Sequence, residues 1–212
     1  MYTYETPYWE AGKLVCGIDE AGRGPLAGPV CAAAVILDPD YTIEGLNDSK
    51  KLTEKKRAQL FEEIKAHALS YCIAFATEQE IDEINILQAT FLAMNRAYDG
   101  LDRPADVAFV DGNRDPHLAC RETTCIVKGD AKSASVAAAS ILAKVTRDRY
   151  MEMLDEQYPQ YLFKVHKGYP TKKHVEALLE HGPSEVHRQT FLKKILARGT
   201  YKTADSGEDH AG

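Results

Sequence analysis

LVCGIDEAGRGPLAGPV, residues 14–30, combines a buried strand, two adjacent acids and a glycine-rich turn within seventeen residues. The first residues are apolar, as in a central strand, and this run ends on Asp19 and Glu20. Because side chains alternate across a strand, the two acids point to opposite faces and can share a site only where the strand ends. The glycines and prolines that follow permit a tight turn, so we expect a stiff concave corner beside the carboxylates.

Two further acids follow strand-like segments. Asp111 ends the apolar run ADVAFV, and Asp130 follows a short predicted strand at 125–127. Strand ends at one edge of a sheet can bring acids together. The candidates for a single site of this kind are Asp19, Glu20, Asp111 and Asp130. Clustered carboxylates repel one another without a cation, and oxygen-only ligands suit Mg²⁺ or Mn²⁺ rather than zinc. Any one acid could instead cap a turn or helix; together they favour two-metal phosphodiester hydrolysis.

The hydrophobic pattern predicts an α/β protein. After the first strand, strands are predicted at 29–37, 42–47, 70–77, 105–110 and 125–127. Helices are predicted at 53–69, at 80–98 with a break near Asn85, at 133–156, and around 175–179 and 191–196. The small residues at the start of the 133–156 helix allow it to pack close to the sheet. Strands first, then alternating helices and strands, indicate a mixed sheet flanked by helices.

The composition is that of an ordinary soluble globular protein, with 44% hydrophobic and 27% charged residues. We expect a cytoplasmic location and no membrane partner, because no apolar run or signal core is long enough. Five cysteines without CxxC spacing predict reduced, mostly buried thiols rather than a zinc site. The net charge of −6 argues against a simple polyanion binder. Yet Lys and Arg outnumber Asp and Glu by 12 to 7 over 144–202, which suits phosphate binding there or merely a solvated charged face.

The segment GIDEAGRGPLAGPV resembles the signature of bacterial ribonuclease HII, the type 2 ribonuclease H. Further matches follow in family order: DSKKLTEKKR at 48–57, VDG at 110–112, KGDAKSASVAAASILAKVTRD at 128–148 and HKGYPTKKH at 166–174. The resemblance implies a ribonuclease H-like, five-stranded mixed sheet in a catalytic domain over 13–160. It also implies a C-terminal helical, substrate-binding appendage over 161–198. The polar, acidic tail at 203–212 is expected to be disordered.

The resemblance implies an endoribonuclease that hydrolyses the RNA strand of RNA/DNA hybrids and nicks 5′ of ribonucleotides embedded in duplex DNA, as in ribonucleotide excision repair. It implies 3′-hydroxyl and 5′-phosphate products and a monomer with Mn²⁺ or Mg²⁺ at a two-metal site. The positions that match the family's catalytic, metal-binding carboxylates are Asp19, Glu20, Asp111 and Asp130. The positions that match its ribose readers are Gly22, Arg23, Gly24 and Tyr169. Phosphate contacts are expected from Asn47, Ser49, Lys50 and Lys51, and further lysines that could hold phosphates are Lys128, Lys167, Lys172 and Lys173.

Other functions fit the pattern less well. A metal-dependent DNA nuclease or resolvase on the same fold would keep the acids but need no 2′-hydroxyl reader. A nucleotide-binding module is disfavoured because GxxxxGK[ST] is missing and the adjacent acids would repel phosphate. A dinucleotide-binding turn is also disfavoured, because here the acids precede the glycines. We assign Asp148, a fifth acid in a matching block, a structural role paired with a base on the long helix.

Overall fold

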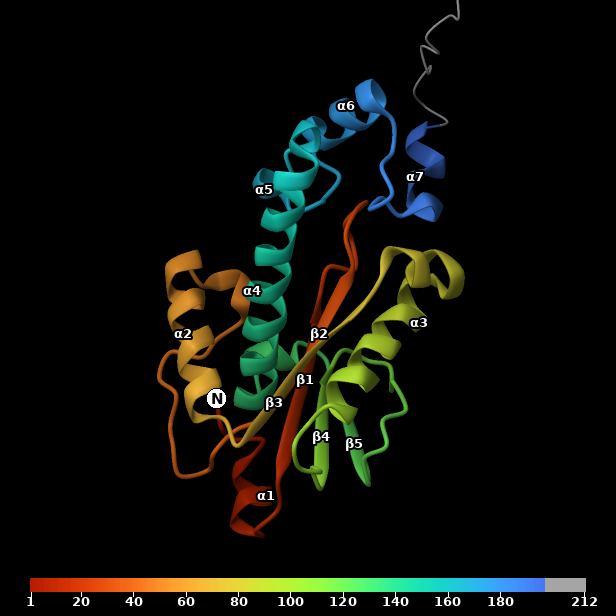
Figure 1. The fold of residues 1–212 in the computed structure, drawn as a ribbon. Helices are drawn as coiled ribbons and strands as arrows, with labels where there is room; N and C mark the ends of the chain where they lie inside the picture. Colours follow the sequence, from red (N-terminus) through yellow and green to blue (C-terminus); the bar gives the residue numbers. More distant parts are fainter. Residues whose placement is uncertain (197–212) are drawn as a thin grey trace, which may run out of the picture.

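The computed structural model describes residues 1–196, whose arrangement is shown in Figure 1. One five-stranded sheet has the strand order β3-β2-β1-β4-β5. Its strands are β1 (Val15–Ala21), β2 (Val30–Ile36), β3 (Ser70–Ala76), β4 (Val107–Asp111) and β5 (Glu122–Ile126). β1, β2 and β3 pair antiparallel, whereas β4 pairs parallel with both β1 and β5. The predicted mixed sheet is confirmed, and β1 lies at its centre.

Three long helices flank the sheet: α2 (Glu54–His67), α3 (Glu78–Asp99) and α4 (Ala134–Gln157). Each begins after a Thr or Ser whose side chain accepts a backbone N–H bond, namely Thr53, Thr77 and Ser133. The shorter helices are α1 (Thr6–Glu10), α5 (Phe163–His166), α6 (Lys172–His181) and α7 (Gln189–Leu196). Single 3₁₀ turns cover Ser49–Lys51, Gly129–Ala131 and Pro159–Tyr161. The chain therefore has helices on both faces of one sheet.

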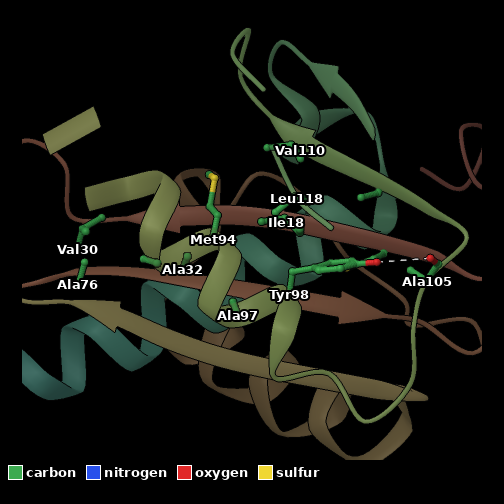
Figure 2. Close-up of a cluster of buried hydrophobic side chains, with 14 of the residues drawn as sticks. Ile18, Val30, Ala32, Ala76, Met94, Ala97, Tyr98, Ala105, Val110 and Leu118 are labelled. Atoms are coloured by element: carbon green, nitrogen blue, oxygen red, sulfur yellow. Dashed lines mark hydrogen bonds between the residues drawn. The ribbon is translucent and has the colours of Figure 1, made fainter. Parts of the chain in front are cut away.

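The two faces of the sheet form separate cores. Alternate residues of β1 and β2, such as Ile18 and Ala32, pack with Met94 and Ala97 of α3 (Figure 2). The opposite face of β2 packs against α2 and α4. At Gly17, a Cβ atom would lie 2.0 Å from the backbone carbon of Ser135, so the absence of a side chain lets α4 approach β1 closely. Burial on both faces explains why β1 and β2 read as continuous apolar runs.

Several sequence predictions need correction or can be confirmed. Residues 42–47 form no strand: a turn at Gly45, with φ +84°, interrupts them, and Ile43 and Leu46 are buried under the helices instead. The last strand runs over Glu122–Ile126, so it begins before the predicted 125–127. The predicted break in α3 is confirmed at Asn85, where φ is +67°. The tail predicted at 203–212 lies outside the described residues.

The C-terminal segment packs against the far end of α4 (Figure 1). Phe163 and Ala177 share one buried cluster with Met151 of α4 and Ala27 of the glycine-rich turn. Leu178 and Leu192 form a second cluster with Leu26 of the same turn. The turn after β1 is therefore a buried anchor for the helices that follow α4.

The cysteines differ in part from the sequence prediction. All five are free thiols, but only Cys16 and Cys31 are buried, while Cys72, Cys120 and Cys125 are partly exposed. The prediction of reduced thiols is consistent with this arrangement; that of mostly buried ones is wrong. Within residues 1–196, no helix is long and apolar enough to cross a membrane.

Candidate active site

The parallel register of β1 and β4 places two of the predicted acids side by side. Ile18 pairs with Val110, so Asp19 and Asp111 occupy the next position on neighbouring strands. Alternation sends Asp19 towards α4 and Glu20 towards α3, as expected for a strand. Both nevertheless line the same cavity, because β1 ends immediately after them, at Ala21.

Asp130 reaches this group from the short helical turn after β5. The backbone N–H of Gly129 donates to Asp111 Oδ1 over 2.6 Å, which ties this turn to the end of β4. The ammonium of Lys50 lies 3.8 Å from Asp130 Oδ2. The structure therefore brings the four predicted carboxylates to one end of the sheet.

Burial and the charges of neighbouring acids disfavour the charged forms of Asp19, Glu20 and Asp130. The pKa of Asp19 is raised well above its usual value, first by burial and then by the charges of Glu20 and Asp111. Burial also raises the pKa of Glu20, and the neighbouring Arg23 partly opposes that rise. For Asp130, burial raises the pKa and Lys50 partly opposes it. Such a cluster is stabilised by any cation that binds among the carboxylates.

The oxygen atoms of these four carboxylates are suitable ligands for a hard divalent cation. All four side chains offer carboxylate oxygen, the ligand that Mg²⁺ and Mn²⁺ prefer. Within the described residues, no three acidic, histidine or cysteine side chains already surround a single ion position. The residues that would hold a cation therefore lie at one end of the sheet without forming a closed ion site.

A cavity of about 410 Å³ joins Asp19 and Glu20 to the glycine-rich turn, whereas Asp111 and Asp130 are not among the residues that line it. Its wall includes Asp19, Glu20, the turn at residues 22–24 and Tyr169. A Cβ atom on Gly24 would lie 3.5 Å from the ring carbon Cε1 of Tyr169, so the tyrosine ring stands directly beside the turn. The sequence places these two segments more than 140 residues apart, and the fold brings them together.

The predicted phosphate-binding residues at 47–51 divide into two groups. Ser49 and Lys50 line the cavity, and the Ser49 hydroxyl lies 2.9 Å from that of Ser140. Asn47 and Lys51 are exposed and do not line it; the side chain of Asn47 accepts the N–H of Asp48.

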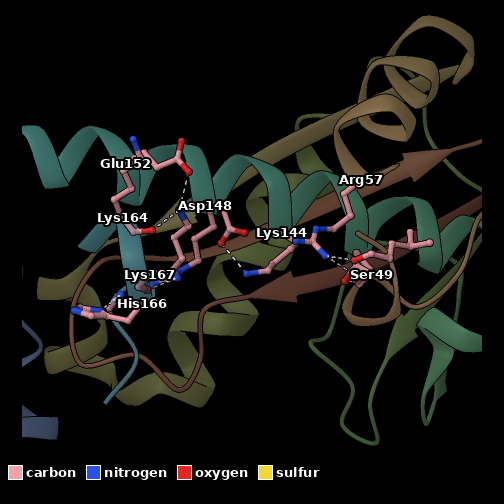
Figure 3. Close-up of polar contacts among 12 residues, drawn as sticks. Ser49, Arg57, Lys144, Asp148, Glu152, Lys164, His166 and Lys167 are labelled. Atoms are coloured by element: carbon pink, nitrogen blue, oxygen red, sulfur yellow. Dashed lines mark hydrogen bonds and ion pairs between the residues drawn. The ribbon is translucent and has the colours of Figure 1, made fainter. Parts of the chain in front are cut away.

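Sequence reasoning missed Ser140 and Lys144, which line the cavity one turn apart on α4. Their spacing of four residues, the helical repeat, was the available signal. Lys144 donates to Asp148 Oδ1 over 2.7 Å, which confirms the predicted pairing of Asp148 with a base on α4 (Figure 3). Lys167, a candidate phosphate ligand, instead donates to Glu152 over 2.7 Å.

Three buried histidines support the backbone around Tyr169. A carbonyl can only accept, so His174 donates through Nδ1 to Tyr169 O at 3.0 Å, and its Nε2 is the acceptor. His187 accepts from Ser184 N at Nδ1 and therefore donates from Nε2 to His174 Nε2 at 3.1 Å. Burial lowers the pKa of His174 and of His187 to about 4 each. His166, stacked on His174, also has a lowered pKa. The network requires neutral rings.

A mixed sheet with acids clustered where its central strands end, beside basic side chains, defines a nuclease of the ribonuclease H-like class. The sequence model of the family described as ribonuclease HII matches residues 16–194. A ribonuclease HII of Burkholderia thailandensis is 59% identical over 180 residues, covering 85% of this chain and 84% of the relative. The chain belongs to the ribonuclease HII family and is therefore a ribonuclease H, an enzyme that hydrolyses the RNA strand of RNA/DNA hybrids.

Solved structures agree with this assignment. The crystal structure of ribonuclease H2 from Pyrococcus horikoshii OT3 matches with a TM-score of 0.72 and 31% identity, covering 87% of this chain and 98% of that one. Bst-RNase HIII, solved in complex with Mn²⁺, matches with a TM-score of 0.74 over 89% of this chain and 70% of that one. Its identity is 18%, so this second likeness supports the fold.

Proposed function

We propose that this enzyme, besides hydrolysing RNA in hybrids, nicks duplex DNA 5′ of a single embedded ribonucleotide. Cleavage leaves a 3′-hydroxyl and a 5′-phosphate, as a step in removing ribonucleotides from DNA. The observation that carries the proposal is a cavity whose wall includes two of the carboxylates, Asp19 and Glu20, together with the turn beside Tyr169. A reader of one 2′-hydroxyl next to the cleavage chemistry suits a substrate with only one ribose.

In this proposal Asp19, Glu20, Asp111 and Asp130 hold Mg²⁺ or Mn²⁺ at a two-metal site. When bound, the ions supply an activated water and charge stabilisation for the leaving oxygen. The raised pKa values of Asp19, Glu20 and Asp130 support this role, because burial first and the neighbouring acids second disfavour their charged forms, and bound cations would offset both effects. The presence of Mn²⁺ in the Bst-RNase HIII structure is consistent with it.

The other residues of the cavity orient the substrate. Lys50 and Lys144 offer ammonium groups to phosphate oxygens, and the peptide N–H groups of the turn at 22–24 offer donors to the ribose. Tyr169, a residue that is 42% exposed, lines the same cavity. Holding the scissile phosphate against the carboxylates lowers the entropic cost of reaching the transition state.

We further propose that residues 161–198 act as a substrate-binding appendage to a catalytic domain at 13–160, in a monomeric enzyme; positions 197 and 198 lie outside the described residues. The exposed lysines Lys172 and Lys173 at the start of α6 support this role. The appendage packs against the end of α4 and against Ala27 of the glycine-rich turn. A substrate phosphate bound by the appendage would therefore be held by elements that contact the active-site turn directly.

The decisive experiment uses one duplex in three versions: a single ribonucleotide in DNA, an RNA/DNA hybrid, and all DNA. With Mg²⁺ or Mn²⁺, we expect one cut 5′ of the ribonucleotide, cleavage of the hybrid, and no cleavage of all-DNA duplex. Cleavage of the hybrid alone would refute recognition of a single ribonucleotide. Equal cleavage of the all-DNA duplex would instead support a DNA nuclease or resolvase.

The role of Tyr169 can be tested on the same substrate. Tyr169→Ala should slow cleavage of the single-ribonucleotide duplex, because the contact that orients the ribose is lost while the carboxylates remain. Tyr169→Phe separates the contributions: a loss equal to that of Ala implicates the hydroxyl, and retained activity implicates the ring. Wild-type rates in both variants would contradict any role for Tyr169.

A further inference from the structure

Two buried arginines hold the backbone around the glycine-rich turn. Arg188, which immediately precedes α7, donates to the carbonyls of Gly22 (2.6 Å), Arg23 (3.0 Å) and Gly28 (2.8 Å). Arg147 of α4 donates to three other carbonyls, those of Ala27, Pro29 and Lys167. The two residues are 0% and 1% exposed, respectively. Six backbone carbonyls therefore compensate two guanidinium groups that have left water.

The peptides held by Arg188 differ from those held by Arg147. In a trans peptide, the C=O and the following N–H point in opposite directions, and the described residues contain no cis peptide. Arg188 binds the carbonyls of Gly22 and Arg23. The N–H groups of the same two peptides, which belong to Arg23 and Gly24, therefore point away from Arg188. Within residues 1–196 these two N–H groups donate to no protein acceptor, and both residues line the active-site cavity.

The N–H groups that follow the Arg147 carbonyls are occupied or face the sheet. Gly28 N donates to Val186 O at 2.9 Å, and Gly168 N donates to His166 Nδ1 at 3.2 Å. Val30 begins β2. The carbonyl of Gly28, the third acceptor of Arg188, precedes Pro29, which has no N–H. Arg147 also packs against Gly22, where an added Cβ atom would lie 2.0 Å from its Nε atom. Of the two arginines, however, it is Arg188 that binds the carbonyls of the two peptides with free N–H groups.

We propose that Arg188 is a positioning residue for ribose discrimination, because it sets the two peptide planes whose N–H groups face the 2′-hydroxyl. This inference rests on the proposed recognition of a single ribonucleotide. The chain holds Arg188 itself firmly: its N–H donates to Leu26 O at 2.8 Å, and its guanidinium lies 5.2 Å from the ring centre of Phe191. The carboxylate of Asp82 then accepts the next two N–H groups, from Gln189 and Thr190.

The test compares Arg188→Lys with the matched substitution Arg147→Lys in the full chain with Mg²⁺. For each protein one measures KM for a single-ribonucleotide duplex and the inhibition constant of the same duplex made entirely of DNA. The ratio of the inhibition constant to KM reports discrimination. Loss of stability by itself lowers the active fraction and leaves this ratio unchanged.

We expect Arg188→Lys to lower the ratio about threefold to tenfold for each hydrogen bond to the ribose that is lost. Arg147→Lys should lower the melting temperature and keep the ratio within about twofold of wild type, because its peptides present no free donor. Asp82→Ala, which removes the support of the segment after Arg188, should lower the ratio in the same direction and keeps the test decisive should Arg188→Lys fail to fold.

Three results would overturn the proposal. The first is an unchanged ratio in a folded Arg188→Lys protein or, should that variant not fold, in Asp82→Ala. The second is an equal loss in both lysine variants, which would mean that the turn as a whole matters and not the peptides that Arg188 holds. The third is a wild-type ratio of one, which would show that binding does not discriminate the 2′-hydroxyl and would overturn this inference; the proposed function is tested separately, by whether the single-ribonucleotide duplex is cut at all.

Discussion

The buried histidines beside the active site predict that this protein loses stability in mild acid. His174 and His187 each have a folded-state pKa of about 4, against 6.5 for an exposed histidine. Between these values the unfolded chain binds more protons, so the free energy of unfolding falls as the pH falls from 6.5 towards 4. From pH 7 to pH 5 the loss is about 2 kcal/mol for each ring, or about 4 kcal/mol for the pair.

The assay is urea unfolding at pH 7 and pH 5 without divalent metal, on wild type, His187→Gln and His117→Gln. Raised acid pKa values, such as that of Asp19, shift stability in the opposite direction, but they are shared by all three proteins. His187→Gln should be destabilised at pH 7, and its deficit should shrink by about 2 kcal/mol at pH 5, because one buried base is gone. The exposed His117 is the matched control, and its variant should follow wild type. A His187→Gln deficit that is the same at both pH values would refute the reasoning.

Four further predictions address the site. Asp19→Asn should abolish cleavage while raising the melting temperature of the metal-free protein, because a buried, repelled charge is removed; near-normal turnover would contradict its role. Gly22→Ala should cost about 3 kcal/mol of unfolding free energy, since φ is +98° and the added methyl would lie 2.0 Å from a buried arginine side chain; an unchanged urea midpoint would be evidence against this strain. Replacing Lys172 and Lys173 by Ala should flatten the salt dependence of substrate binding by up to about one unit per lost contact, and an unchanged slope would reduce both to solvated charges. Asp148→Asn should lower stability by about 0.5 kcal/mol and spare activity, so a folded but inactive variant would reassign Asp148 to the chemistry.

Local sequence patterns determined the framework of this protein. The apolar run that ends on Asp19 and Glu20 marks the central strand, and Thr53 and Ser133 mark the starts of two long helices. The third, α3, begins at Glu78 after the cap Thr77, two residues before the predicted start. These signals lie within a few neighbouring residues, because strand alternation and helix capping are short-range effects. The same range explains the error at 42–47, where an apolar pattern indicated a strand but a turn at Gly45 placed the segment elsewhere.

The tertiary structure alone decided which of these residues meet. The register of β1 and β4 sets Asp19 beside Asp111, and the docking of the C-terminal helices sets Tyr169 beside Gly24. Arg188 reaches the carbonyl of Gly22 across 166 positions of sequence. No local pattern encodes such contacts, because they depend on how two cores pack on opposite faces of one sheet and on where a third cluster then fits. The sequence thus determined the chemistry available to the site, and long-range packing decided its geometry.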